Sequence, residues 1–294
     1  MKYRTVILSG DDQRERDPAE FLSVIVAAHN EESYIADCLN ALLEQSQATG
    51  PVEVVVAANA CTDGTQEIVT TFGPSFKNRD WRLVLLDIAE SGKPNAFNCG
   101  DAAASGNTRI YLDADVKCDP DLLGQLRGAL SVERPVYATG TLQVVPPRTW
   151  VTRRYAEFWV RLPFIQGGAV GAGLFAVNPA GRARWGEFPA IISDDTFVRL
   201  NFSPDERVEV PANYHWPMVE GARNLIRVRR RQDSGVEEIH RLYPDLTANE
   251  AKKKLTVPDL LRLMCQAPLG FVVYSVMQAA VRLRPGTSEW VRGR

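Results

Sequence analysis

Hydrophobic and polar residues follow two different periods in the first half of the chain. Four apolar runs of strand length stand at 22–28, 52–59, 82–87 and 109–113. Continuous apolar runs of this length are typical of strands that are covered on both faces. Between the runs, apolar residues recur at helical spacing. This order predicts an α/β domain with a doubly wound, mostly parallel sheet that is flanked by helices.

Each segment between the runs carries its own helix signal. Ile35, Leu39 and Leu42 share one helical face, the segment 62–72 begins at a Thr-Asp pair that can cap a helix, and 93–105 is rich in alanine. Beyond about residue 130, prolines and glycines interrupt the chain. There the alternation of strand and helix ends, and no further βα unit is predicted.

The composition narrows the function classes. The 294 residues are 45% hydrophobic and 24% charged, as in a globular protein with a large core. The formal net charge of −2 gives no overall attraction to nucleic acid, so we predict no such partner. The five cysteines form no CxxC pair and favour a reducing compartment. The N-terminal segment has an apolar stretch too short for a signal-peptide core, which predicts a cytoplasmic protein.

Polar residues follow all four predicted strands. In a doubly wound sheet, ligands bind beyond the carboxyl ends of the strands. The residues expected at this edge are His29 to Glu31, Asn59 to Asp63, Asp87 with Ser91 to Lys93, and Asp113 with Asp115.

Asp113 and Asp115 are two like charges, one residue apart, directly behind a buried strand. Aspartates are common in turns, so the pair could simply shape the chain after the strand. Alternatively, the pair binds a divalent cation, whose charge removes the repulsion. Their position at the edge where ligands bind favours the cation-binding alternative.

Five motifs, in this order and spacing, resemble those of the family 2 glycosyltransferases, which have the GT-A fold. They are SVIVAAHNEESYIADCLNALLEQ, VVVAANACTDGT, GKPNAFNCG, YLDADV and ISDDTFVRL. The resemblance covers roughly residues 21–235. It implies an inverting transfer of a sugar from a nucleotide-diphosphate sugar to the hydroxyl of a carbohydrate or lipid-linked acceptor. It further implies a role in the synthesis of a cell-surface polysaccharide or glycolipid.

The resemblance also suggests how the chain is divided. Residues 21–250 form the GT-A domain, with a nucleotide-binding half at about 21–130 and an acceptor half at about 131–250. An N-terminal segment (1–20) precedes this domain, and a C-terminal helical segment (251–294) follows it.

By resemblance, Asp113-Ala114-Asp115 is the DxD motif that holds Mg²⁺ or Mn²⁺ against the diphosphate. Asp115 is expected to bind the metal, and Asp113 to lie near the ribose or the metal's waters. His215 could complete the metal shell, although a lone histidine is more often structural.

Several further residues are assigned to the donor by resemblance. Ala28 ends the first strand, Asn30 and Glu31 follow it, and the Glu31 carboxylate is expected to accept hydrogen bonds from ribose hydroxyls. Asn59 stands where the family often has an aspartate that reads a uracil N–H, a bond that an amide oxygen can also accept. Lys93 matches a basic position near the nucleotide, with a solvated surface lysine as its alternative.

An arginine-rich segment lies where the family has a Gln/Arg-rich motif ending in Trp, and no Trp follows it here. Arginine suits phosphate, and we assign Arg229 and Arg230 to the diphosphate. In the second acidic pair, the resemblance makes Asp195 the general base that takes the proton of the acceptor hydroxyl. Asp194 is then its orienting or acceptor-binding neighbour. The alternative is that the pair only caps a helix.

Two other functions compete with sugar transfer. The run GAGLFA (171–176) matches a dinucleotide fingerprint with an acid about 20 residues on, as in an NAD(P)-dependent dehydrogenase. Prolines and glycines after this run argue against the long helix that the fingerprint needs. A non-catalytic carbohydrate-binding relative would be expected to lose Asp115 or Asp195, and both are present.

The segment 263–281 has 19 residues without a charge, which is close to the length of a membrane span. Pro268 is expected to break or kink a helix there. From Arg223 to Arg294 the chain has 14 Lys/Arg against 7 Asp/Glu. Three alternatives remain open for 255–284: a helix packed on the domain, a helix in the membrane interface, or a span. The basic excess favours peripheral contact at the inner face of the membrane.

Overall fold

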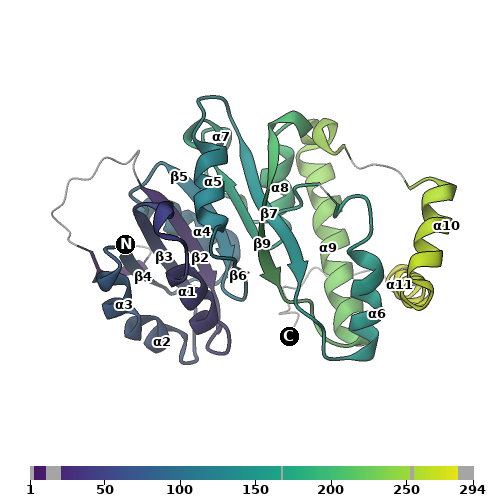
Figure 1. Cartoon of the computed structure of the whole chain (residues 1–294), viewed down its shortest axis with the longest axis horizontal. Coiled ribbons are helices and arrows are strands. Elements are labelled where there is room, and N and C mark those ends of the chain that lie inside the picture. Colours follow the sequence, from purple (N-terminus) through teal and green to yellow (C-terminus); the bar gives the residue numbers. More distant parts are fainter. Residues whose placement is uncertain (1–2, 11–20, 167, 252–254, 284–294) are drawn as a thin grey trace.

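The computed structural model describes residues 3–10, 21–166, 168–251 and 255–283. In these residues, nine strands form one sheet in the order β1-β4-β3-β2-β5-β8-β7-β9-β6, and helices cover both faces (Figure 1). The strands are β1 (Tyr3–Ser9), β2 (Leu22–Ala28), β3 (Val52–Asn59), β4 (Arg82–Ile88), β5 (Thr108–Asp113), β6 (Lys117–Cys118), β7 (Tyr137–Val144), β8 (Leu174–Val177) and β9 (Arg207–Trp216).

The helices follow the predicted order in the first half of the chain. The α-helices are α1 (Ile35–Leu43), α2 (Thr65–Thr71), α3 (Gly73–Asn78), α4 (Lys93–Ala103), α5 (Leu122–Leu130), α6 (Trp150–Trp159), α7 (Pro179–Arg182), α8 (Asp194–Leu200), α9 (Ala222–Leu242), α10 (Val257–Gln266) and α11 (Pro268–Arg282). In the second half of the chain, α8, α10 and α11 lie where helices were expected, and α6, α7 and α9 were not predicted. Three 3₁₀ helices, η1 (Gln47–Thr49), η2 (Pro204–Glu206) and η3 (Pro244–Asn249), complete the described elements.

The predicted parallel strands form the first half of the sheet. Strands β4, β3, β2 and β5 pair in parallel, and nearly all their residues are buried. Alternate residues of β2 face opposite layers: Val24 and Val26 pack with α1 and α5, whereas Ile25 packs toward α4. Gly100 lets α4 approach closely, because a Cβ there would lie 2.3 Å from the Ile25 side chain.

The second half of the sheet is mixed, which refines the prediction of a mostly parallel sheet. β8 runs antiparallel to both β5 and β7, β6 runs antiparallel to β9, and β7 pairs in parallel with β9. β1, which the sequence did not predict as a strand, adds an antiparallel edge beside β4. These strands are short or only partly buried, so they lack the apolar runs that identify the parallel ones.

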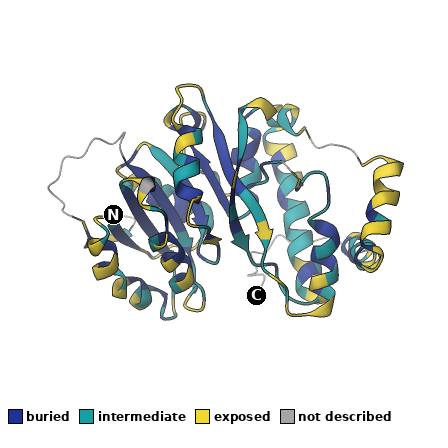
Figure 2. Ribbon diagram, in the orientation of Figure 1, coloured by how far each residue is buried: buried dark blue, intermediate teal, exposed yellow. Residues whose placement is uncertain are grey.

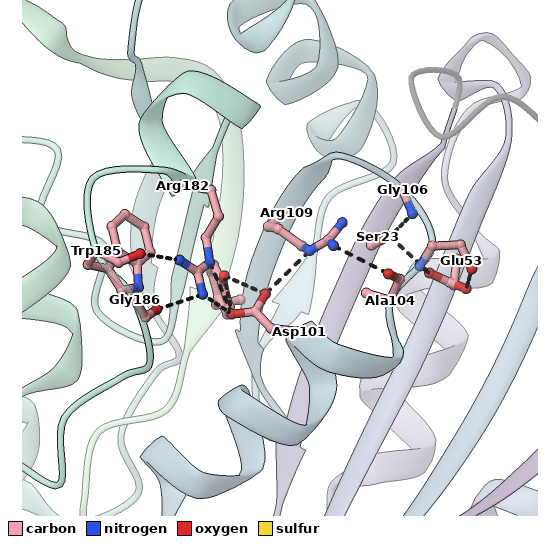
Figure 3. Close-up of polar contacts among 11 residues, drawn as sticks. Ser23, Glu53, Asp101, Ala104, Gly106, Arg109, Arg182, Trp185 and Gly186 are labelled. Atoms are coloured by element: carbon pink, nitrogen blue, oxygen red, sulfur yellow. Dashed lines mark hydrogen bonds and ion pairs between the residues drawn. The ribbon is translucent and has the colours of Figure 1, made fainter.

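Two polar networks lie at the amino ends of the strands, and one of them joins the two halves of the chain (Figure 3). Asp101 of α4 lies between two arginines: its carboxylate is 3.3 Å from Arg109 Nε and 2.9 Å from Arg182 Nη2. Because Arg182 belongs to α7, this contact ties α4 to the second half of the chain. Glu53, which is fully buried, accepts hydrogen bonds from Ser23 and Arg82. A buried carboxylate is tolerated only with such partners.

Candidate active site

The carboxyl ends of β2, β3, β4 and β5 meet at one edge of the sheet, as predicted. Asn59, at the end of β3, is buried and connects this edge. Its Nδ2 donates to the Ala28 carbonyl oxygen at 2.8 Å, and its Oδ1 accepts from the Gly92 N–H at 3.1 Å. Asn59 therefore holds the end of β2 and the start of α4. The predicted base-reading role of Asn59 remains a prediction; its amide oxygen has a second lone pair in addition to the one used by the Gly92 N–H.

The loop after β2 is bonded to the loop after β3. Asn30 adopts a left-handed conformation with φ of +55°, which Asn tolerates better than most residues, and its Oδ1 accepts from the Thr62 N–H at 2.7 Å. The Glu31 N–H donates to Thr65 Oγ1 at 2.7 Å. These bonds fix the backbone that carries the Glu31 carboxylate, whose predicted contact with ribose remains a prediction.

β5 ends at Asp113, and the DxD motif follows a tight turn. The Asp113 N–H donates to the Gly173 carbonyl oxygen at 2.8 Å, and the Val116 N–H donates to the Asp113 carbonyl oxygen at 3.1 Å. Ala114 is buried, whereas both aspartates are only partly buried. The turn interpretation thus describes the backbone, and both aspartates lie at the edge where ligands are expected to bind.

Lys93 brings the two acidic motifs together. It is the first residue of α4, and its Nζ lies 2.8 Å from Asp113 Oδ1 and 3.2 Å from Asp194 Oδ2. Burial alone would lower the pKa of Lys93, but the charges of Asp113, Asp194 and Asp195 outweigh it and raise the pKa. The ammonium group is therefore charged at neutral pH. The solvated surface lysine, which was the alternative, does not fit these contacts.

The second acidic pair opens α8. Asp194 is only 5% exposed, and its burial raises its pKa to about 6, although the charge of Lys93 opposes this rise. The neighbouring Asp195 is less buried, and its Oδ1 accepts from the Thr196 N–H at 2.6 Å. The helix-cap interpretation thus accounts for one contact of Asp195, its bond with the Thr196 N–H in the first turn of α8. Asp194 is instead a partner of Lys93.

Three other predicted residues have partners outside this cluster. His215 Nε2 lies 2.8 Å from Asp119 Oδ1, and its role as a metal ligand remains a prediction. Arg229 bonds within α9, where its Nη2 donates to Asp233 Oδ1 at 2.9 Å. Arg230 Nη2 donates to the Ala280 carbonyl oxygen at 2.6 Å. The guanidinium of Arg230 thus caps the last turn of α11, where backbone carbonyls lack helical partners, and its diphosphate role remains a prediction.

The donor set fits a cation that is held partly by the substrate. Among the described residues, no group of three or more His, Cys, Asp or Glu side chains is placed to enclose a metal by itself. Mg²⁺ in particular is commonly held by one or two carboxylates together with phosphate oxygens and water. Asp113 and Asp115 supply two carboxylates at the edge of the sheet where a diphosphate could bind.

The Gly-rich run contributes a contact that sequence reasoning did not find. Gly171 and Gly173 have φ of +66° and +76°, and the Gly173 carbonyl oxygen accepts from the Asp113 N–H. A Cβ at Gly173 would lie 2.8 Å from the Trp216 ring. In the sequence, only the density of glycine in this run could have indicated such a close contact. The run leads directly into β8 and not into a helix, so it lacks the geometry of a dinucleotide-binding turn.

We expect Lys93→Met to destabilise the protein by about 1–3 kcal/mol. Removing one partner of a buried ion pair costs about 3–5 kcal/mol, and less here because the Lys93 side chain is 30% exposed. In the wild type, burial raises the pKa of Asp194 to about 6, and the charge of Lys93 opposes this rise, so the variant should have a still higher pKa at Asp194. The difference in stability between wild type and variant should therefore grow as pH rises above about 6, where Asp194 ionises only in the folded wild type. Urea unfolding at several pH values tests this, with Lys77→Met on the exposed face of α3 as control; equal losses in both variants would contradict it.

Comparisons with known proteins identify relatives of this chain. Residues 23–183 match the profile of Glycosyl transferase family 2. The chain is 33% identical over 112 residues to Glycosyltransferase AglE of Haloferax volcanii, which covers 38% of this chain and 35% of that protein. It is also 33% identical over 107 residues to Poly-beta-1,6-N-acetyl-D-glucosamine synthase of Staphylococcus epidermidis, covering 36% of this chain and 24% of that protein. The matched region thus spans about a third or less of the length of these relatives.

One solved structure shares the fold over most of the chain. The mannosyltransferase PcManGT from Pyrobaculum calidifontis, in complex with GDP-Man and Mn²⁺, aligns with a TM-score of 0.54 at 21% identity. The alignment covers 91% of this chain and 76% of that one. At this identity, the likeness bears on the fold alone.

Proposed function

Because this chain belongs to glycosyltransferase family 2 and has the GT-A fold, we propose that it transfers a sugar from a nucleotide-diphosphate sugar to an acceptor hydroxyl with inversion. The observation that carries this proposal is the position of Lys93. Its ammonium group contacts Asp113 of the DxD motif and Asp194 of the second acidic pair. A donor diphosphate at the first motif and an acceptor hydroxyl at the second would therefore be neighbours.

Asp113 and Asp115 would hold Mg²⁺ or Mn²⁺, and the bound cation would neutralise the charge that grows on the leaving diphosphate. Glu31, which follows β2, is proposed to orient the donor through its ribose hydroxyls. Lys93 keeps a positive charge beside Asp113 and orients Asp194. PcManGT was solved with GDP-Man and Mn²⁺, which supports this donor class.

Asp195 is proposed as the general base. Its carboxylate takes the proton of the acceptor hydroxyl, and the acceptor oxygen then attacks the anomeric carbon. The anomeric carbon–oxygen bond to the diphosphate breaks, and its electron pair leaves with the nucleoside diphosphate. Asp194 is the orienting neighbour, because Lys93 fixes it from one side and burial restricts it from the other.

A screen of nucleotide-diphosphate sugars by thermal shift, with and without Mn²⁺, tests the donor. A ligand that binds only the folded state raises its stability by RT ln(1 + [L]/Kd). At least one nucleotide sugar should therefore raise the melting temperature, and more strongly with Mn²⁺ than in EDTA. Failure of every nucleotide sugar to stabilise the chain would contradict the proposal and favour the carbohydrate-binding alternative.

The C-terminal segment is proposed to dock on a lipid surface. In the described residues, no single helix is long and apolar enough to cross a membrane; only α10 and α11 taken together reach that length and composition, and they form a pair bent by 118°. α11 packs on the domain through one face, where Tyr274 stacks on Tyr155 of α6. The bend lies just before Pro268, as predicted.

The other faces of these helices are apolar and exposed. Figure 2 shows α10 exposed along most of its length. The large apolar side chains exposed on α10, α11 and the following residue are Val257, Leu260, Leu261, Leu269, Val272, Val276 and Leu283. Arg262 and Arg282 are exposed on the same helices. An apolar face flanked by basic side chains is typical of helices that lie in an anionic membrane interface. Such docking would allow the enzyme to reach an acceptor that is attached to a lipid carrier.

We expect the chain to bind anionic vesicles of phosphatidylglycerol and phosphatidylcholine at low salt. High salt should release it, because screening shortens the Debye length to about 3 Å at 1 M. The double variant Val272→Asp/Val276→Asp should lose binding in vesicle co-sedimentation, whereas Val132→Asp, on a distant exposed loop, should not. These variants are preferable to a deletion, which would uncover the side of α6 that α11 covers. Equal sedimentation of both variants would contradict the docking surface.

A further inference from the structure

A cleft of about 490 Å³ lies between the end of β7 and helix α6. Its volume is within the range of small-molecule sites. The polar side chains that line it are Thr141, Gln143, Arg153, Glu157, Gln166 and Glu209. Aliphatic side chains and two prolines of the loop after β7 form the rest of the lining. None of these residues belongs to the donor site or the acidic pairs.

The cleft and the candidate active site share one loop. Glu209 Oε2, in the cleft, accepts from the Ala169 N–H at 3.2 Å. Four residues later, the Gly173 carbonyl oxygen accepts from the Asp113 N–H at 2.8 Å. Gln166, just before this loop, also lines the cleft. This loop is therefore bonded to a residue of the cleft at one end and to the DxD motif at the other, so it connects the cleft with the candidate active site.

The lining has the chemistry of a site for a neutral sugar. Carboxylates and amide oxygens accept hydrogen bonds from hydroxyl groups, and amide and guanidinium nitrogens donate to ring and hydroxyl oxygens. The aliphatic side chains and prolines offer apolar surface to the C–H faces of a sugar ring. Glu157 is ion-paired with Arg154 at 2.7 Å, which leaves Glu209 and Arg153 as the other charged groups of the lining. The lining therefore has no net charge that would attract an anionic ligand.

Glu209 makes this selectivity sharper because it is partly buried. Its Oε1 accepts from Thr141 Oγ1 at 3.4 Å, and its Oε2 accepts from the Ala169 N–H, so both oxygens are held in place. Burial raises the pKa of Glu209 above its ordinary range, and the hydrogen bonds from Ala169 and Thr141 oppose this rise. A ligand carboxylate placed beside Glu209 would be repelled by its charge.

We propose that this cleft binds a neutral saccharide unit of the acceptor, adjacent to the unit that receives the transferred sugar. The identification of the bound saccharide as part of the acceptor rests on the proposed function, whereas saccharide binding in the cleft does not depend on catalysis. The acceptor is thereby assigned to the class of neutral oligosaccharides or glycosides, and uronic acids or phosphorylated sugars are excluded from this position.

Saturation-transfer NMR with cellobiose, maltose, lactose and cellobiouronic acid tests the inference. At least one neutral disaccharide should bind, and cellobiouronic acid should bind at least about tenfold more weakly. Val160→Trp, which fills the cleft, and Gln143→Ala, which removes a donor from its rim, should each weaken binding, the first by at least about tenfold. Val132→Trp, at an exposed position outside the cleft, is the control and should bind as the wild type does.

Glu209→Gln gives the sharpest specificity test. Its amide oxygen can still accept from Ala169, but the charge is gone, so the preference for neutral over uronic disaccharides should shrink several-fold. Absence of binding by every neutral disaccharide, equal binding by Val160→Trp and wild type, or an unchanged preference in Glu209→Gln would each overturn the inference. Hydrolysis of a nucleotide sugar by the wild type reports on the proposed function separately, so the two can fail independently.

Discussion

Asp195→Asn is expected to lower the rate of sugar transfer by at least about 10²-fold, because a positioned general base contributes about 10²–10⁴ to the rate. Asn keeps the size of the side chain, and its oxygen can still accept from the Thr196 N–H, so α8 should begin as in the wild type. Donor affinity should change by less than a few-fold. Release of nucleoside diphosphate in the presence of an acceptor measures the rate, and calorimetric titration measures donor binding.

The control for this variant is Asp205→Asn, because Asp205 is exposed on η2, away from both acidic motifs. It should keep full activity. Asp194→Asn distinguishes the roles of the two carboxylates. It removes one of the two carboxylate partners of Lys93, so it should lower the stability of the protein as well as the rate of transfer. Full transfer activity in Asp195→Asn, with a loss confined to Asp194→Asn, would move the role of the base to Asp194.

Asp115→Asn should abolish the cation-dependent stabilisation of the protein by a nucleoside diphosphate. At a ligand concentration of about 100 Kd, the wild type should gain roughly 2.7 kcal/mol. The variant should gain almost nothing, because an amide is a weaker ligand for a hard cation than a carboxylate. Thermal unfolding with UDP or GDP, in Mn²⁺ and in EDTA, measures the difference.

Asp121→Asn, at the start of α5, serves as the matched control and should respond like the wild type. The melting temperature of the unliganded Asp115→Asn protein should stay close to that of the wild type, since Asp115 follows the end of β5 and is only partly buried. Equal stabilisation by nucleotide in Mn²⁺ and in EDTA would remove the cation from the proposed site.

The nucleotide-binding half could be predicted closely because its signals are local. β2 and β3 have the bounds that their apolar runs indicated. β4 ends one residue later than predicted, and β5 begins one residue earlier. A strand buried on both faces must be apolar throughout, so its limits are visible in the sequence. The DxD motif likewise follows its strand directly, and its position at the ligand-binding edge came from topology alone.

The contacts that define the site could not be predicted, because they join residues far apart in the chain. Lys93 was assigned to the nucleotide, yet its ammonium group lies between Asp113 and Asp194, about 20 and 100 residues away. Arg230 was assigned to phosphate, and it binds the end of α11. Both are cations that pair with whatever oxygen the fold brings near, and charge alone does not identify that partner.

The C-terminal segment shows the same limit. Its length and lack of charge were compatible with a buried helix, an interfacial helix or a span. In the structure, α11 is buried on one face through Gly270, Met277 and Val281 and exposed on the other through Val272 and Val276. The bend between α10 and α11 and the packing of α11 on the domain bear on these alternatives, and neither can be read from hydropathy.

Following the anomeric proton of a nucleotide sugar by NMR tests the proposed function most directly. The wild-type chain is incubated with Mn²⁺ and each of UDP-, GDP- and dTDP-linked hexoses, with water or a neutral disaccharide as acceptor. For at least one donor, the α-anomeric signal should decay while the first-formed product carries the β configuration, and Asp195→Asn should slow this by at least about 10²-fold. A first-formed α product, or an intact donor in every case, would contradict inverting sugar transfer by this chain.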